Sequence, residues 1–302
     1  MALGGAVLFS AKAILAKLVY RECPISVTDV LAFRMLFAFP FYLAIFFVQW
    51  QSRQHDNNSG EKSGNPKALH YWAAIGLGLL GYYVSSFFDF LGLKFISAGL
   101  ERIILFSYPT MVLIFGALIY KTPIRGYQWV ALLLSYAGIA VSFAADLSIG
   151  NWADTVKGSL LIVGCAVTFA LYILWSGRVV SSMGAAWFTS VAMLAASVGI
   201  FVHYFLFGSS VSFMMRLPGQ VYLYLFLMGV FSTVVPTLLV SAALKRIGSN
   251  NLAIVSAIGP MTTIFLAYIF LGEAVGWSQL AGAILVISGV LIAGKQSIKQ
   301  AP

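Results

Sequence analysis

Residues 97–120 read SAGLERIILFSYPTMVLIFGALIY, an apolar run interrupted by two adjacent charges, Glu101 and Arg102, and by Pro109. At about 1.5 Å per residue, an α-helix of this length crosses a hydrocarbon core of roughly 30 Å. Because lipid offers no water to satisfy backbone groups, only helices and closed barrels span a membrane. Barrel strands would alternate in roughly 10-residue units, whereas this run is continuous. It therefore predicts a membrane-spanning helix.

Runs of the same kind fill the rest of the chain. Of the 302 residues, 61% are hydrophobic and only 9% are charged, whereas about 25% of residues in soluble domains are charged. Ten spans are predicted, at residues 3–20, 27–50, 70–93, 97–120, 124–145, 157–180, 183–208, 218–244, 249–272 and 275–294. The hydrophilic segment 51–69 is predicted to be a loop. We therefore expect an all-α integral membrane protein with ten transmembrane helices.

The region around the quoted run has a counterpart later in the chain. Residues 91–142 align without gaps on residues 242–293, an offset of 151. The matched positions are Leu93-Lys94-x-Ile96 with Leu244-Lys245-x-Ile247, Ile103 with Ile254, Pro109 with Pro260, Gln128 with Gln279, and Gly138 with Gly289. We therefore expect two five-helix repeats, residues 1–150 and 151–302. Because five is odd, the two repeats must have opposite orientations in the membrane, as in many secondary transporters.

Basic residues predict how the chain is oriented. With both termini in the cytoplasm, ten of the 18 Lys and Arg residues flank spans on that side and four flank them on the other. The cytoplasmic set is Arg53, Lys62, Lys67, Lys121, Arg125, Arg178, Lys245, Arg246, Lys295 and Lys299; the opposite set is Arg21, Lys94, Lys157 and Arg216. Cytoplasmic loops carry the excess of positive charge. We expect both termini, and the loop 51–69, to be cytoplasmic.

Several short motifs resemble the drug/metabolite transporter superfamily, specifically its EamA-type members. In the second half these are Pro260, Leu271-Gly272-Glu273, Gln279, Gly282 and Gly289; in the first they are Gly5 with Lys12, Arg34, and Ser97-Ala98-Gly99-Leu100. One departure is Lys121-Thr122, which stands where the second half has Gly272-Glu273. The resemblance covers nearly the whole chain. It implies a bacterial inner-membrane exporter of amino acids or other metabolites, and it specifies the fold better than the substrate.

Ionisable side chains inside spans are the first candidates for a functional site. Each costs at least about 2.5–3.5 kcal/mol at a helix centre, so each needs a partner, water or a function. Lys12 lies near the middle of its span and is a candidate contact for a substrate carboxylate. Five others lie in the outer third of the first four helices: Lys17, Arg34, Asp89, Glu101 and Arg102. We expect these five to form an ion-pair cluster that is either a static set of salt bridges or an external gate, with proton exchange as a further option.

Aromatic and hydroxyl side chains on the third, fourth and sixth spans are the remaining candidates. The resemblance implies that these helices line a central cavity. Tyr82, Ser85, Tyr108, Tyr172 and Trp175 are expected to contact substrate there. Most of the aromatic residues, which make up 15% of the chain, instead pack or meet lipid.

Three prolines inside apolar runs are hinge candidates: Pro109, Pro236 and Pro260. Proline removes a backbone hydrogen bond and tends to kink a helix. A fixed bend and a hinge are both consistent with the sequence.

Other classes of protein fit less well. The formal charge of +9 is scattered between apolar runs, which does not suggest nucleic-acid binding. Cys23 and Cys165 lie far from any His, so we expect no metal site, and no cofactor or enzyme motif is visible. A secondary transporter of a small polar metabolite, acting by alternating access in the direction of export, is the preferred interpretation. The alternatives are a channel-like facilitator and a nucleotide-sugar or drug-type carrier of the same fold. Besides lipid and substrate we expect no partner, and a monomer is favoured over a dimer.

Overall fold

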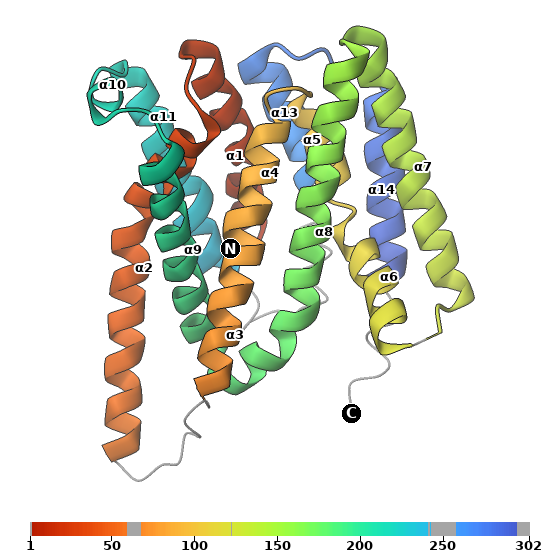
Figure 1. Ribbon diagram of the computed structural model, residues 1–302. Coiled ribbons are helices and arrows are strands. Elements are labelled where there is room, and N and C mark those ends of the chain that lie inside the picture. Colours follow the sequence, from red (N-terminus) through yellow and green to blue (C-terminus); the bar gives the residue numbers. More distant parts are fainter. Residues whose placement is uncertain (1, 59–67, 122, 241, 243–257, 295–302) are drawn as a thin grey trace.

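The computed structural model describes residues 2–58, 68–121, 123–240, 242 and 258–294, and over these ranges the chain is helical without strands (Figure 1). The first half contains α1 (Ala2–Glu22), α2 (Val27–Asn58), α3 (Ala68–Gly78), the π-helical segment η1 (Leu79–Val84), α4 (Ser85–Gly92), α5 (Ala98–Leu105), α6 (Tyr108–Tyr120) and α7 (Gly126–Ile149). The second contains α8 (Trp152–Met183), α9 (Ala185–Phe207), α10 (Val211–Met215), α11 (Gly219–Gly229), the π-helical segment η2 (Val230–Val234), α13 (Gly259–Leu271) and α14 (Trp277–Gly294).

The protein is a multi-pass membrane protein. Within the described ranges, eight helical stretches are long and apolar enough to cross a bilayer, and α13 and α14 are shorter apolar helices. The eight stretches match the predicted spans up to 218–244, whose last residues lie outside the described part. The start of the predicted span 249–272 also lies outside it, as do Lys245, Arg246 and Lys295. The segment 51–69 is not all loop, because α2 continues to Asn58.

The run 97–120 is broken rather than continuous. α5 ends at Leu105, a turn follows at Phe106 and Ser107, and α6 begins at Tyr108. Pro109 lies in the first turn of α6, where its missing N–H has no intrahelical partner to lose. Pro260 has the same place in α13. Both prolines therefore begin helices instead of bending them, while Pro236 follows η2 within a helix.

The local backbone pattern recurs with the spacing of the sequence repeat. The starts of α3 and α11, of η1 and η2, of α6 and α13, and of α7 and α14 are each 151 residues apart. The residues that end α6 and α13 also correspond, because Lys121 (φ 53°) and Gly272 (φ 67°) are both left-handed. A left-handed residue is a common helix terminator. Each half therefore places a π-helical segment and a proline-started helix at matching positions.

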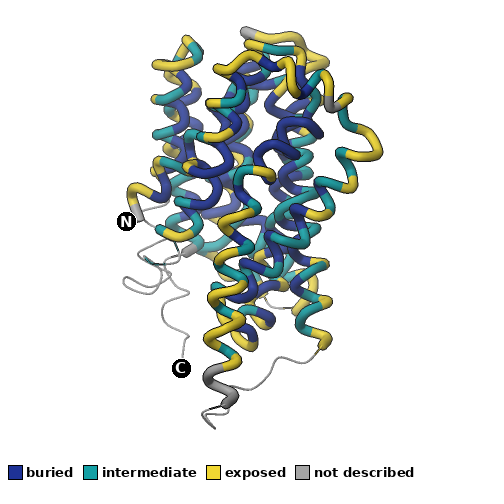
Figure 2. The backbone as a smooth tube through the Cα atoms, turned by 90° about the vertical axis from the view of Figure 1, so that its left-hand side faces the viewer, coloured by how far each residue is buried: buried dark blue, intermediate teal, exposed yellow. Residues whose placement is uncertain are grey.

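Buried residues occupy the middle and the upper part of the bundle as drawn (Figure 2). The largest apolar core joins α1, α2, α4, α9 and α11, with Tyr42, Phe90 and Leu31 fully enclosed. α7 packs closely against α14: a Cβ built on Gly138 would lie 2.5 Å from the carbonyl oxygen of Gly282. Small residues allow such close helix approach in membranes. The centre of the bundle, between α1, α2, α4, α5 and α8, holds the charged side chains.

Candidate functional site

A cavity of about 280 Å³ lies at the centre of the bundle. Its wall includes Lys12 on α1, Arg34 on α2, Asp89 on α4 and Arg102 on α5. Each of these side chains belongs to a residue that is 7% exposed or less. Helices from both halves contribute, since Thr233 of η2 and Gly259 of α13 also line it. Four of the six charged residues predicted from their depth along the chain therefore surround one space.

Lys12 and Asp89 form an ion pair across that space. The Lys12 ammonium lies 2.5 Å from Asp89 Oδ2, and the two side chains are 8% and 1% exposed. Nζ also lies 5.8 Å from the ring centre of Phe9 and 5.7 Å from that of Phe90. A buried pair of this kind offsets the desolvation of both charges only while both partners are present. Lys12 therefore already has a counterion when the cavity is empty of substrate.

Two arginines are held by hydroxyl groups from the other half of the chain. Arg34 Nε donates to Thr233 Oγ1 at 2.9 Å, and Nη1 donates to Ser86 Oγ at 3.2 Å. Arg102 Nε donates to Thr263 Oγ1 at 3.0 Å, and Nη2 donates to the backbone oxygen of Phe9 at 3.0 Å. Neither threonine stands out in the sequence, because a lone Thr inside an apolar run is common and carries no periodic signal.

Glu101 lies behind the cavity wall and is fully buried. Its nearest basic group is Arg102 Nε, 4.0 Å from Oε2. Both Glu101 oxygens and Asp89 Oδ1 are buried and have no hydrogen-bond partner among the described residues. Two carboxylates can only accept, so a hydrogen bond between them requires one proton. The buried Glu101 carboxyl group, together with the Asp89 carboxyl group, is therefore a candidate place for a proton.

Lys17 lies apart from this cluster. It pairs with Glu273 Oε1 at 3.1 Å, and the two side chains are 23% and 19% exposed. The carboxylate of Glu273 also accepts from the backbone N–H of Ala98, at the start of α5. Glu273 belongs to the quoted Leu271-Gly272-Glu273 motif, but the sequence does not indicate its partner.

Two of the four aromatic candidates line the cavity. Tyr82 and Tyr108 line it, and so does Ser85. Tyr172 does not line it but hydrogen-bonds to the hydroxyl group of Tyr82 at 3.0 Å. Trp175 is 42% exposed and points away from this space. Phe169, which the sequence does not single out, packs edge-on against Tyr108 at 5.0 Å and completes the wall.

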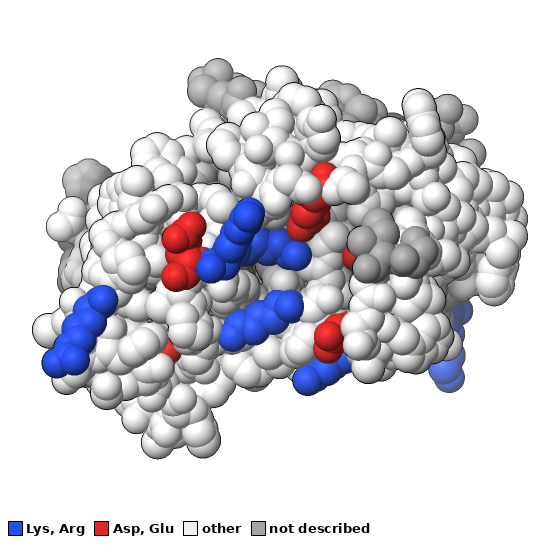
Figure 3. Space-filling model, turned by 90° about the horizontal axis from the view of Figure 1, so that it is seen from above, with Lys and Arg blue, Asp and Glu red and all other residues white. Residues whose placement is uncertain are grey.

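A second space opens at the upper end of the bundle. This vestibule has a volume of about 790 Å³, and its wall includes Lys17, Arg21, Lys94 and Glu273. Figure 3 looks onto this end and shows lysine and arginine side chains with acidic ones around the middle of the face. Burial lowers the pKa of Lys94, and the nearby carboxylate of Asp29 partly offsets that change. Lys94 Nζ donates to the backbone oxygen of Ile25 at 2.9 Å.

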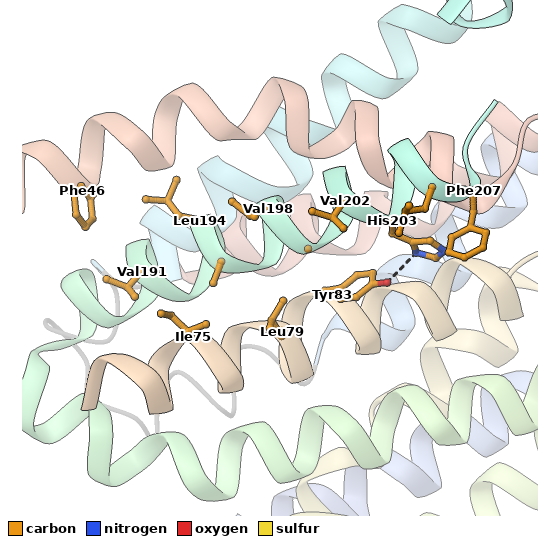
Figure 4. A pocket seen from close by; sticks show the side chains of 13 residues that line it. Phe46, Ile75, Leu79, Tyr83, Val191, Leu194, Val198, Val202, His203 and Phe207 are labelled. Atoms are coloured by element: carbon orange, nitrogen blue, oxygen red, sulfur yellow. Dashed lines mark hydrogen bonds between the residues drawn. The ribbon is translucent and has the colours of Figure 1, made fainter. Parts of the chain in front are cut away.

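A third space is apolar and differs in kind. It is a groove of about 740 Å³ between α2, α3, η1 and α9, lined by side chains such as Phe46, Leu79 and Val198 (Figure 4). Its main polar feature is the hydrogen bond between Tyr83 and His203, at 2.9 Å. Because Val198 is 56% exposed, this groove faces the hydrocarbon side of the bundle. It has no charged group to recognise a polar molecule, so the central cavity is the candidate site. Over the described part of the chain, no cluster of three His, Cys, Asp or Glu side chains could hold a metal ion.

The chain is similar to other transporters over nearly its whole length. Residues 1–144 and residues 156–294 match the EamA-like transporter family. Uncharacterized transporter YcbK of Bacillus subtilis (strain 168) is 30% identical over 296 residues, which cover 95% of this chain and 90% of YcbK. Uncharacterized transporter YcxC of the same organism is 26% identical over 69% of each chain. A solved crystal structure of a protein shares the fold, with a TM-score of 0.63 at 17% identity and coverage of 100% of this chain and 97% of the other.

The ion pair in the cavity predicts a specific cost of removing one partner. Asp89→Asn leaves the Lys12 ammonium buried without a counterion, which should destabilise the fold by about 3–5 kcal/mol. Thermal unfolding of the purified protein in detergent measures this change. Replacing both partners, with Lys12→Gln and Asp89→Asn together, should restore most of the loss, and Asp154→Asn on the exposed start of α8 is the matched control. An Asp89→Asn protein as stable as wild type would mean that the two charges do not depend on each other.

Proposed function

The chain belongs to the EamA-like transporter family, and from that premise we propose that it moves a small polar metabolite through the central cavity by alternating access. It is a transporter and not an enzyme. The observation that carries the proposal is the enclosed cavity with four charged side chains in its wall. Ionisable groups are kept at this depth in a membrane mainly where they serve a pathway or a binding site. A cavity of about 280 Å³ is close to the lower limit for small-molecule sites, roughly 300 Å³.

Alternating access requires two related halves that can exchange their packing. The proposed halves are two inverted five-helix repeats, residues 1–150 and 151–302, which give ten spans in total. The recurrence of helix starts 151 residues apart and the separate family matches at 1–144 and 156–294 both support this division. Inverted repeats with a midplane site are a common design of secondary transporters.

Among the gate candidates, Lys17 suits the role best. Its pair with Glu273 borders the vestibule and is less buried than the pair of Lys12 with Asp89. Such a contact opens at lower cost than the buried pair does. Pro109 and Pro260 start α6 and α13 beside turns, so the proposed hinges are these turns, with Pro236 next to η2 as a third.

The preferred substrate is an amino acid or a related compound, and the preferred direction is export, by a monomer. A channel-like facilitator and a nucleotide-sugar or drug-type carrier are the alternatives within the same fold. Only a carrier shows counterflow, in which unlabelled substrate on one side drives uptake of labelled substrate from the other.

Flux through reconstituted protein tests the proposal. Proteoliposomes incubated with a defined mixture of amino acids and small organic acids should take up at least one component saturably and show counterflow. Gly259→Leu should abolish this uptake, because among the described residues a Cβ at Gly259 meets only Ser10 Oγ, at 3.7 Å, and the longer side chain then fills the cavity. Gly276→Leu, outside the cavity, is the control. Flux without saturation or counterflow would favour a facilitator, and uptake unaffected by Gly259→Leu would remove this cavity from the pathway.

The proposed location is the inner membrane, with both termini in the cytoplasm and the vestibule outside. Cys23 lines the vestibule and is partly exposed, so a membrane-impermeant maleimide should label it in intact cells. A cysteine introduced as Ser181→Cys, at the exposed opposite end of α8, should react only after permeabilisation. Removing Cys165 gives a clean background. If Cys23 and the cysteine introduced by Ser181→Cys were labelled from the same side, the predicted number of spans would be wrong. The inverted repeat, which depends on that number, would then be wrong as well.

Proton coupling is a second candidate property, favoured by the carboxyl pair of Glu101 with Asp89. The charged groups that face Glu101 are Asp89, Arg102 and Lys12. Glu101→Gln removes the titratable group at nearly constant size, so the free energy of unfolding should change by less than about 1.5 kcal/mol. The pH dependence of flux should then flatten, with the exposed Glu22→Gln as control. A pH profile equal to that of wild type would exclude Glu101 as the coupling proton's site.

A further inference from the structure

Arg34 is a buried cation that makes no direct contact with an acid among the described residues. The residue is 5% exposed, and no described carboxylate lies within 4.0 Å of its guanidinium group. Its two hydrogen bonds go to neutral hydroxyl groups, and Nη2 has no partner among the described residues. An isolated ion away from water is costly, and buried charges in proteins are normally paired. Arg34 therefore presents an unused donor and an unbalanced charge to the cavity that it lines.

The other charges around the cavity do not supply the missing anion. Asp89 is the acidic residue of the described wall, and its Oδ2 atom is already paired with Lys12 Nζ at 2.5 Å. Arg102 contacts the adjacent Glu101 only at 4.0 Å. The described wall therefore carries three cations and one anion, and the cluster keeps a positive charge even with Glu101 ionised behind it. When Glu101 is ionised, a single negative charge in the cavity would neutralise the cluster.

The vestibule has the same sign. Its described wall contains the cations Lys17, Arg21 and Lys94 against the single acid Glu273. Clefts lined by one sign of charge concentrate ligands of the opposite sign and raise their rate of entry. Two separate spaces in one chain are thus both net positive.

Most of the remaining surface of the cavity wall is apolar, and it is interrupted by the hydroxyl groups of Ser10, Ser85, Ser86, Ser232, Thr233 and Thr237. Tyr82, Tyr108 and Phe169 present ring surface, and Phe9 and Phe106 add more. A substrate that matches both features carries a negative group for Arg34 and an apolar body for this wall. The planar guanidinium group binds a carboxylate through two parallel hydrogen bonds, which a lysine cannot do.

We propose that the substrate class is that of small organic carboxylates with an apolar body, and that Arg34, not Lys12, anchors the carboxylate. Asp89 serves as the counterion that keeps Lys12 from competing for it. This inference rests on the proposed transport function, because it assigns a ligand to the same cavity.

Matched pairs of carboxylates and amides test the assignment. The full-length purified protein is heated with acetate or acetamide, phenylacetate or phenylacetamide, and succinate or succinamide, at constant ionic strength, with inorganic phosphate as a further probe. At least one carboxylate should raise the unfolding temperature while its amide does not. Arg34→Gln should lower the affinity for that carboxylate by about 10- to 100-fold, which is the range for a lost hydrogen bond to a charged group. Arg34→Lys should lie in between, and the exposed Arg216→Gln should match wild type.

Thr233→Val keeps the test decisive if Arg34→Gln does not fold. It leaves the charge in place but removes the acceptor that orients Nε, so the preference for carboxylate over amide should shrink. Equal stabilisation by carboxylates and amides, or an Arg34→Gln protein that retains the preference, would overturn the proposal. Stronger Arg34-dependent stabilisation by phosphate than by every carboxylate would also overturn the proposed class.

The cavity-filling Gly259→Leu variant separates this failure from failure of the proposed function. If amides bind as well as carboxylates and Gly259→Leu abolishes both, the cavity is still the transport site and only the substrate class is wrong. If Gly259→Leu leaves the binding of every probe unchanged, the site itself is wrong.

Discussion

The centre of this protein depends on one constraint, which is that charges placed in a membrane interior must be neutralised or hydrated. Lys12 and Asp89 satisfy it directly, since their side chains meet at 2.5 Å and are nearly inaccessible. The pair joins α1 to α4, and Phe9 and Phe90 pack around the ammonium group. Removing water from both ions is offset only while the geometry holds. This contact therefore links two helices and leaves the two arginines as the charges of the cavity wall that the pair does not balance.

Much of the fold could be predicted from the sequence because lipid imposes a simple rule on backbone groups. Apolar runs of about 20 residues identified the helices, and in the structure π-helical segments and helix starts recur with the same offset of 151 that the sequence shows. Two details could not be read this way. The run 97–120 contains a turn at Phe106 and Ser107, and Pro40 lies inside α2 without ending it. Hydropathy measures polarity and not backbone continuity, so neither feature has a signal in it.

The candidate site could be predicted less completely, for a different physical reason. Depth along a helix follows from a fixed rise per residue, so Asp89, Glu101 and Arg102 could be predicted to lie at one depth. Pairing depends instead on how each helix is rotated about its axis and on which helices are neighbours. Lys17 has the depth of the cluster yet pairs with Glu273, a residue 256 positions away in the chain. Thr233 and Thr263, which hold the two arginines, could be found only from the packed structure.

The same distinction between depth and pairing changes which cation is the best candidate for binding a substrate anion. Judged by depth alone, Lys12 is the hardest charge to explain and the natural ligand for a substrate anion. Once its pair with Asp89 is known, Lys12 is electrically satisfied, and Arg34 becomes the charge without a counterion. A binding group must be stable in the empty protein and still gain from its ligand. Hydrogen bonds to two hydroxyl groups hold the Arg34 side chain in position, but these neutral groups cannot neutralise its charge. That combination leaves the electrostatic part of the interaction available to a substrate, which is the property expected of an anchor in a carrier.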